Sequence, residues 1–530
     1  MDRRRARRLD PVGVPGRCRL VYGDAGPTAG LRARVPASGD RRDPTLGALG
    51  RRVHPQGAES VSPVAKRSIG LLVSLTVLAG CASFPEAQPL ERVDTGSGYR
   101  YANLEGAENS EELFVILSFS GGGTRAAALA YGVLETLRDS WVEMDGEPRN
   151  LLDEVDVISS VSGGSFTAAY YGLHRDAIFE EGGRFQRDFL YRDVESDLKR
   201  RLLNPYNWAR LASPTFGRIE LAEEVYQERL FDQASFADLA DDGRKPFLLI
   251  NATDMDKGSQ FTFVQSQLDP MCVDLDSIPL SRAVAASSNF PIAFTPLTLN
   301  SYPGRCGYQE PPWVANALEG LNTNPRRYYR ARHWQRYQEP ERDHVHLLDG
   351  GVSDNIGLRP ALDALRAPTL QEVEWSVLNK MNREIVDKLV VIVVDAKSED
   401  LAADFDTSPR SPGPKRVINT IATTPLANYS FDTVELLRET LRDREDAQRL
   451  SLEAGTGMHQ IDLYYIYVGF DQLQDDAERE RFQRIPTRFR LPSEEVDALR
   501  QIGAELLEQS PCFQQLVGQR EGSGGRLCSH

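Results

Sequence analysis

The stretch from Val155 to Phe166 could present a catalytic nucleophile. It reads Val-Asp-Val-Ile-Ser-Ser-Val-Ser-Gly-Gly-Ser-Phe, an apolar strand pattern that stops at Ser162 before a helical pattern begins. A sharp turn between a strand and a helix holds a serine hydroxyl out of the fold, and only small residues fit beside it. In the usual Gly-x-Ser-x-Gly elbow both flanks are glycine, whereas here Ser160 precedes and Gly164 follows. The alternative is an ordinary loop rich in glycine and serine.

A glycine cluster upstream could supply an oxyanion hole. An apolar strand pattern over residues 112–120 ends in Gly121, Gly122 and Gly123, and Arg125 lies at the edge of this loop. The cluster has neither the acidic partner of a dinucleotide fingerprint nor the Gly-Lys-Ser/Thr of a phosphate loop. Successive glycines let backbone N–H groups converge beside a helix N-terminus, where each donor stabilises an oxyanion by about 3–4 kcal/mol.

A third glycine turn could supply a base. The segment His346-Leu-Leu-Asp349-Gly350-Gly351 reads as a short strand that delivers a carboxylate into a turn. Taken alone, it is more typical of an ordinary Asp-Gly turn.

A Ser-His-Asp hydrolase would also need a histidine. His344 and His346 alternate onto the strand face opposite to Asp349, so we expect neither to be its partner. His459 follows Asp349 in chain order, as the Ser…Asp…His order requires, but its polar surroundings indicate a surface residue. We interpret His174, at the end of the helical pattern, as structural.

Apolar strand patterns alternate with helical patterns along the chain. This alternation predicts an α/β fold with a mostly parallel central sheet covered by helices on both faces. The expected strands are residues 112–120, 155–160, 246–251, 345–348, 389–395 and 461–469, and helices are expected through 417–450 and 493–509. Residues 300–343 have no clear period.

The glycine loop, the serine turn and the Asp-Gly-Gly turn, in this order, resemble the patatin-like phospholipases. Three further segments are similar to that family: Asn251-Ala-Thr-Asp254, Ala286-Ser-Ser-Asn-Phe-Pro291-Ile-Ala-Phe294-Thr-Pro296, and Asn355 after the Asp-Gly-Gly turn. The resemblance extends over about residues 113–395, and the tail to residue 509 is similar to the bacterial lipoprotein branch. Ser160 and Ala126 stand where the family carries glycine, and both are small.

This resemblance implies a three-layer patatin-like domain that hydrolyses carboxylic esters of lipids, in the manner of a phospholipase A. Ser162 would be the nucleophile and Asp349 its direct base, with Gly121, Gly122 and Gly123 as oxyanion donors and an acyl-enzyme intermediate. The alternatives are a lysophospholipase, a thioesterase or a general esterase, or a catalytically idle lipid-binding protein of the cell envelope. We expect an acyl-ester lipid as partner and neither a cofactor nor a metal.

The N-terminal part predicts export. Lys66-Arg67 precedes an apolar run over 69–78, and Leu78-Ala-Gly-Cys81 follows. A short positive segment, a short apolar segment and a small-residue cleavage site make a secretory signal, and the run is too short to cross a bilayer. The ending resembles the lipobox of bacterial lipoproteins, which implies cleavage before Cys81, a lipid anchor there and, since Ala82 is not aspartate, the outer membrane.

Residues 1–60 differ from the rest of the chain. They carry a net charge of +7. Because the whole chain carries −15, the remaining residues carry −22. So acidic a body excludes nucleic acid as a partner. The first sixty residues are either a basic arm or an extension upstream of a natural start near Val61 or Val64, and the signal favours the second interpretation.

Four cysteines beyond the signal are disulfide candidates in an exported chain, and their proximity suggests the pairs Cys272–Cys306 and Cys512–Cys528. We predict these parts: an extension (1–60), a signal peptide (61–81), a linker (82–110), a catalytic domain (111–398) and a C-terminal extension packed on it (399–530). The aromatic insertion at about 300–343 is either a lid or interfacial patch, or packed on the body. Trp208 has the same two interpretations. The insertion's aromatic residues are Trp313, Tyr328, Tyr329, Trp334 and Tyr337.

Overall fold

The computed structural model describes residues 82–104, 109–144, 146–291, 293–398, 413–518 and 527–528, without the side chains of 414–428. The predicted extension, the signal peptide and Cys81 lie outside these residues. The chain divides into two compact units, Met1–Ala82 and Ser83–His530, and the description below concerns the second. None of its described helices is long and apolar enough to cross a membrane.

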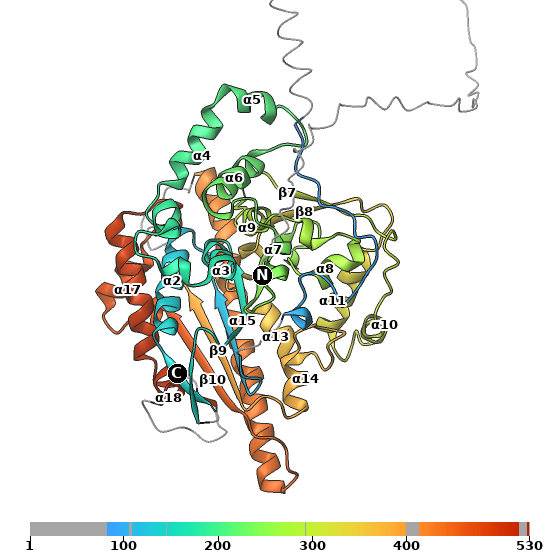
Figure 1. Ribbon diagram of the computed structural model, residues 1–530, viewed down its shortest axis with the longest axis vertical. Helices are drawn as coiled ribbons and strands as arrows, with labels where there is room; N and C mark the ends of the chain where they lie inside the picture. The colour runs from blue at the N-terminus through green and yellow to red at the C-terminus, as the bar shows by residue number, and fades with distance from the viewer. Residues whose placement is uncertain are drawn as a thin grey trace, which may run out of the picture. The chain divides into compact units, whose positions relative to one another are not determined.

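A nine-stranded sheet forms the centre of the described structure (Figure 1). Six neighbouring strands are parallel, in the order β11-β10-β9-β1-β4-β5, and β8, β7 and β6 complete the sheet with antiparallel pairings. The strands are β1 (Leu113–Phe119), β4 (Val155–Val161), β5 (Phe247–Asp254), β6 (Ser259–Thr262), β7 (Leu297–Asn300), β8 (His344–Asp349), β9 (Lys388–Asp395), β10 (Asp462–Gly469) and β11 (Leu527–Cys528). A separate hairpin joins β2 (Trp141–Met144) to β3 (Glu147–Asn150).

Helices cover both faces of the sheet. On one face lie α2 (Thr124–Arg138), α3 (Gly163–His174) and α17 (Ser493–Gln509), and on the other lie α13 (Arg359–Arg366) and α15 (Pro414–Ala454) (Figure 1). Strands β1 and β4 are buried along their whole length, as parallel strands between two helical layers must be. The predicted three-layer α/β fold with a mostly parallel sheet is confirmed.

The remaining helices surround this core. They are α4 (Val194–Leu203), α5 (Pro205–Leu211), α6 (Arg218–Tyr226), α7 (Phe236–Asp242), α8 (Gln265–Leu268), α9 (Leu280–Ser287), α10 (Pro312–Leu318), α11 (Pro325–Arg336), α12 (Gly351–Asp354), α14 (Val377–Asn382), α16 (Asp476–Gln483) and α18 (Pro511–Leu516).

The C-terminal segment completes the sheet and one of its helical layers. Strand β10 pairs with β9 along its length. Helix α17 packs so closely on α2 that a Cβ on Gly132 would lie 2.0 Å from the carbonyl oxygen of Arg500. The Arg500 guanidinium also pairs with Glu135 at 2.8 Å. These contacts hold residues after 413 against the elements that carry the candidate site.

The aromatic insertion is a helical hairpin rather than an irregular loop. Helices α10 and α11 bury Trp313 against Trp334, with ring centroids 5.8 Å apart, in a small core of their own. Tyr337 is buried in the main core and donates to Asp254 Oδ2 at 2.8 Å. Arg330 pairs with Glu372 at 2.9 Å. The insertion is thus anchored on the body, while Tyr329 stays exposed.

Two disulfides link the candidate cysteines. Cys272 is bonded to Cys306, which ties the start of the insertion to the body, and Cys512 is bonded to Cys528, which ties β11 to α18.

Candidate active site

Sheet register brings the predicted serine and aspartate together. Val161, at the end of β4, lies opposite Asn251 of β5. The next residue of β5, Ala252, lies opposite Asp349 at the end of antiparallel β8. Ser162 and Asp349 therefore reach the same edge of the sheet from the two strands that flank β5.

The two side chains are joined by a hydrogen bond. Ser162 Oγ donates to Asp349 Oδ2 at 3.0 Å, and the Gly351 N–H donates to Asp349 Oδ1 at 2.8 Å. Both side chains are buried. One carboxylate oxygen is thus held by backbone while the other faces the serine hydroxyl, the geometry of a nucleophile beside its base.

Burial sets the acid–base behaviour of the carboxyl group. Loss of water raises the pKa of Asp349 to about 7, against the hydrogen bonds from Gly351 and Ser162, which lower it. A general base works best when its pKa lies near the working pH, so Asp349 is poised to exchange a proton at neutral pH.

The turn at Ser162 has the strained backbone of a nucleophile elbow. Ser162 has φ of 50° and ψ of −117°, in the region that residues other than glycine rarely adopt, directly before α3. A Cβ on Gly164 would lie 2.7 Å from Phe119 Cβ, and one on Gly163 would lie 2.1 Å from the Gly123 carbonyl oxygen. The turn therefore admits no side chain at either position.

A cluster of hydroxyls holds the elbow in place. The Ser162 N–H donates to Ser287 Oγ at 2.9 Å, and Ser287 Oγ contacts Ser165 Oγ at 2.9 Å. Ser165 Oγ also donates to Ser160 Oγ at 3.1 Å. Ser160, which replaces the first glycine of the elbow, is thus accommodated by a hydrogen bond. Ser287 lies within the Ala286–Pro296 segment of the sequence, which by itself does not indicate this role.

The glycine loop lies against the elbow, with two free donors. The Gly121 N–H donates to the Asn355 carbonyl at 2.9 Å, so it is not free to stabilise an oxyanion here. Within the described residues, the buried N–H groups of Gly122 and Gly123 have no acceptor. Their φ angles, 151° and 61°, are those that glycine permits. Of the three predicted donors, the N–H groups of Gly122 and Gly123 are therefore the two left available, and their role stays a prediction.

The loop after Asp349 is held by polar groups at the strand ends. Ser118 Oγ donates to the Ile356 carbonyl and Ser159 Oγ to the Gly357 carbonyl, each at 2.6 Å. Asn355 Oδ1 lies 2.5 Å from where a Cβ on Gly121 would be. Ser118 and Ser159 were not predicted as site residues, since their partners lie more than 190 residues away in the chain.

Comparison with known proteins assigns this part of the chain. Residues 117–362 match the family model described as patatin-like phospholipase. These residues form a patatin-like domain. The match contains the glycine loop, Ser162 and Asp349, and it ends within α13.

Three solved structures are similar at low identity. Human GIVD cytosolic phospholipase A2 is 16% identical, with 57% of this chain and 50% of that chain covered and a TM-score of 0.31. Its complex with methyl gamma-linolenyl fluorophosphonate and terbium chloride is 13% identical, with 77% and 60% covered and a TM-score of 0.33. VipD from Legionella pneumophila is 12% identical, with 81% and 73% covered and a TM-score of 0.26. The chain thus spans half to three fifths of the human enzyme's length. No curated protein matches this chain.

Arg125, predicted to lie at the edge of the oxyanion loop, links that loop to distant segments of the chain. Arg125 is buried in the patatin-like domain, and its Nε donates to the Ala396 carbonyl at 2.9 Å. Its guanidinium also binds the Ile485 carbonyl, and Nη2 donates to Thr487 Oγ1 at 3.0 Å. Burial lowers its pKa to about 10, so the side chain stays charged at neutral pH. Arg125 therefore fixes the glycine loop to the C-terminal segment.

None of the described histidines is hydrogen-bonded to Ser162 or Asp349. His459 Nε2 contacts the Val386 carbonyl at 2.9 Å, at the end of the sheet where β9 and β10 begin. His346 Nδ1 contacts Thr298 Oγ1 at 3.0 Å, and His174 contacts the Leu230 carbonyl. These placements favour a dyad without histidine.

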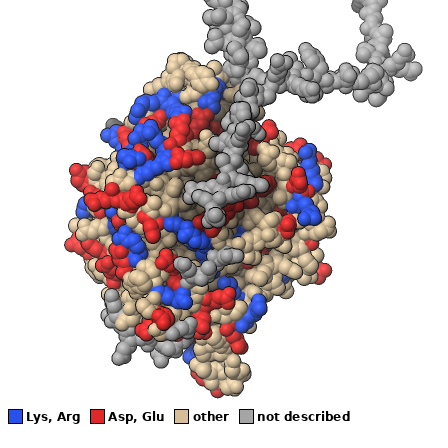
Figure 2. All heavy atoms as spheres, viewed as in Figure 1, with Lys and Arg blue, Asp and Glu red and all other residues tan. Residues whose placement is uncertain are grey.

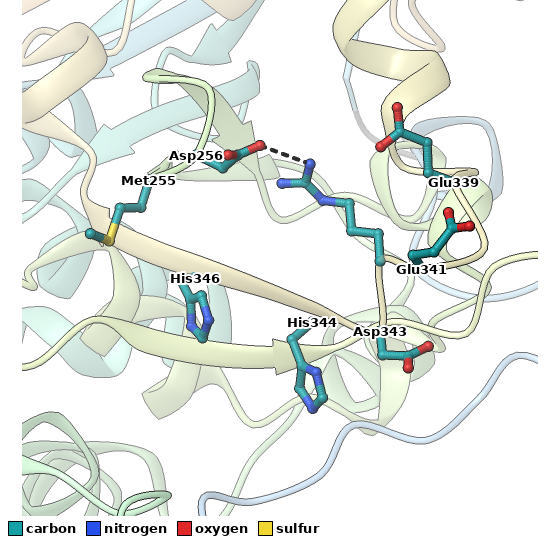
Figure 3. Close-up of a pocket in the computed structure, with 8 residues that line it drawn as sticks. Met255, Asp256, Glu339, Glu341, Asp343, His344 and His346 are labelled. Carbon is teal, nitrogen blue, oxygen red and sulfur yellow. Dashed lines mark hydrogen bonds and ion pairs between the residues drawn. The ribbon is translucent and has the colours of Figure 1, made fainter. Parts of the chain in front are cut away.

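A hollow of about 700 Å³ lies at the antiparallel edge of the sheet, and neither Ser162 nor Asp349 lines it. Asp256, labelled in Figure 3, pairs with Arg342 at 3.1 Å. The hollow is lined by Met255, Asp256, Glu339, Glu341, Arg342, Asp343, His344 and His346. In the described part of the chain, no group of three or more His, Cys, Asp or Glu residues is placed to hold a metal ion.

Proposed function

We propose that the protein is a serine hydrolase that cleaves carboxylic ester bonds of lipids, in the manner of a phospholipase A. The observation that carries this proposal is the 3.0 Å hydrogen bond from Ser162 Oγ to Asp349 Oδ2 inside a patatin-like domain. The free N–H groups of Gly122 and Gly123, beside the N-terminus of α2, support it.

In the first half of the reaction, Asp349 accepts the Ser162 proton as Oγ attacks the ester carbonyl carbon. The oxyanion that forms is stabilised by the N–H groups of Gly122 and Gly123. Collapse breaks the bond to the alkoxy oxygen, which takes the proton from the Asp349 carboxyl group and leaves as an alcohol. The acyl group remains on Ser162.

In the second half, Asp349 accepts a proton from water, and the resulting hydroxide attacks the acyl-enzyme. The fatty acid leaves and Ser162 recovers its proton. One carboxyl group serves both halves because its pKa lies near neutrality. A peptidase is disfavoured, since no histidine in the described part of the chain is placed to protonate an amine leaving group.

Attachment to the bacterial outer membrane through a lipid on Cys81 is the second part of the proposal. It is supported by the Leu-Ala-Gly-Cys sequence after an apolar run. An anchored enzyme would meet its lipid substrate at the membrane surface.

Mass spectrometry of products from phosphatidylcholine vesicles tests the hydrolase. Wild-type protein should release free fatty acid, while Ser162→Ala and Asp349→Asn should not. His346→Ala is the matched control, because it alters the same strand as Asp349 on the opposite face. Fatty acid release by Ser162→Ala at the wild-type rate would refute the proposal.

Two alternatives have distinct signatures. A lysophospholipase, thioesterase or general esterase would prefer the matching member of a substrate panel over intact phospholipid. A catalytically idle lipid-binding protein would leave Ser162 unlabelled by a fluorophosphonate probe.

A further inference from the structure

Helices α4 and α5 form a hairpin with an apolar, exposed tip. Leu203, Tyr206 and Trp208 are 69%, 71% and 57% exposed. They lie within six residues of each other, at the turn between the two helices. The hairpin stands at one end of the described unit, at the top of the view in Figure 1. Large apolar side chains gathered at a projecting tip mark an interaction surface.

The polar groups of the tip are satisfied within the hairpin. Asn204 Oδ1 accepts the Tyr206 N–H at 3.1 Å, and Trp208 Nε1 donates to the Leu202 carbonyl at 2.8 Å. Asn207 Nδ2 donates to the Arg201 carbonyl at 2.9 Å. A segment that enters an apolar medium must satisfy its backbone in this way, since water is no longer available.

Cations surround the tip in an otherwise acidic body. The side chains of Lys199 and Arg200 are 69% and 72% exposed, although each also pairs with an acid of α4, Lys199 with Glu195 at 3.3 Å and Arg200 with Asp197 at 2.8 Å. Residues 194–211 carry four cations and two acids, a net of +2, although residues 61–530 together carry −22. Figure 2 shows the uncharged tip, with blue and red side chains side by side just below it over α4. Such a pattern fits the interface of an anionic bilayer, where Trp and Tyr take the headgroup level and Lys and Arg face the phosphates.

Ion pairs tie the hairpin to the body. The Arg210 guanidinium binds Glu224 of α6, and that of Arg201 binds Glu224 at 3.3 Å. Because these pairs link the hairpin to α6, insertion of the tip would orient the domain.

The base of the hairpin is connected to the oxyanion loop. The Val194 N–H donates to the Phe489 carbonyl at 3.2 Å, and the Thr124 N–H, next to Gly123, donates to the Arg488 carbonyl at 2.9 Å. The adjacent residues Arg488 and Phe489 thus bind the glycine loop and the start of α4, respectively. A bilayer that received the tip would lie near the edge of the sheet that carries Ser162.

We propose that the α4–α5 hairpin docks the protein on the surface of a phospholipid bilayer. The tip inserts Leu203, Tyr206 and Trp208 at the interface, and Lys199 and Arg200 contact lipid phosphates. The hairpin is a second membrane contact beside the proposed anchor.

The test is sedimentation with vesicles of phosphatidylcholine and phosphatidylglycerol (3:1), using the full chain with Cys81→Ser and Ser162→Ala so that neither lipidation nor hydrolysis interferes. Adding Leu203→Ser and Trp208→Ser should weaken vesicle binding at least about tenfold. The matched control adds Leu452→Ser and Trp141→Ser, residues of the same types that are 66% and 56% exposed elsewhere, and it should bind as the parent does.

Equal binding by the two double variants would overturn the proposal. So would a hairpin variant that leaves vesicle binding intact but abolishes self-association in sedimentation equilibrium, which would assign the tip to a second copy of the chain. A hydrolysis assay with Ser162 intact separates this proposal from the proposed function. The hairpin variant should hydrolyse a monomeric water-soluble ester at the parent rate, and failure of all variants to hydrolyse it would leave the binding result standing.

Discussion

Ser162 Oγ and Asp349 Oδ2 form a 3.0 Å hydrogen bond across strand β5, between residues 187 positions apart in the chain. The pairing of β5 with both β4 and β8 fixes this distance through backbone hydrogen bonds. Rigid strands rather than flexible loops therefore position both members of the dyad, which favours a site formed before substrate arrives.

Removal of either dyad member should abolish catalysis. Ser162→Ala and Asp349→Asn should each lower kcat/KM for a phospholipid by about 10³-fold or more, since nucleophile and base act as one unit. The double variant should be no worse than the single ones. Steady-state kinetics check this, and additive losses would show that the residues act independently.

Activity should depend on the ionisation of Asp349. Its pKa of about 7 predicts that kcat/KM falls as the pH drops below about 7, because the protonated carboxyl group cannot accept the serine proton. A pH profile between 5 and 9 measures this. A flat profile down to pH 5 would contradict the assigned base.

Ionisation of Asp349 should lower the free energy of unfolding at high pH. Its pKa is raised on folding, so the folded chain holds a proton that the unfolded chain has released between pH 4 and 7. Stability attributable to this group therefore falls as the pH rises through that window, by an amount on the order of 2–4 kcal/mol. Asp349→Asn should thus be more stable than wild type at pH 8 and about equal at pH 4. Urea unfolding at the two pH values checks this.

The glycine loop should tolerate no side chain. Gly123→Ala would place a Cβ 2.5 Å from the Arg488 carbonyl oxygen at a φ of 61°, which displaces a proposed oxyanion donor. We expect kcat to fall about 10²–10³-fold. Gly146→Ala is the control, because it has a φ of 77° and open space around it, and it should keep full kcat. Equal effects of the two substitutions would remove Gly123 from the site.

The disulfides should stabilise the fold. Cys272 and Cys306 close a loop of 34 residues, whose release in the unfolded chain is worth about 3–4 kcal/mol. Cys272→Ser with Cys306→Ser should lower the Tm under oxidising conditions, and the wild type under reductant, which also opens Cys512–Cys528, should lose at least as much. An unchanged Tm would show that packing of the insertion suffices.

The sequence predicted the strands and the pairing of Ser162 with Asp349 because their signals are local. Buried parallel strands read as unbroken apolar runs, and Ser162 and Asp349 each follow such a run directly. The helices of the insertion escaped prediction because α11 is rich in arginine and buries little beyond Ala331. No local pattern marks a helix whose apolar face is so narrow.

The rest of the site could not be predicted because it depends on tertiary contacts. The loss of Gly121 as a donor results from the approach of Asn355, which lies 234 residues away in the sequence. Ser287 contacts the elbow because α9 packs beside it in the folded chain. Hydroxyls of this kind look like ordinary core serines until their partners are known.

The rate at which a fluorophosphonate modifies Ser162 tests the central claim most directly, because it reports the nucleophile without the steps that follow. We predict a single modified residue, Ser162, by peptide mass spectrometry, with a rate that falls at least about 10³-fold in Asp349→Asn and is unchanged in His459→Ala and His346→Ala. Labelling that survives Asp349→Asn at the wild-type rate, or that is lost in His459→Ala, would contradict a dyad of Ser162 and Asp349.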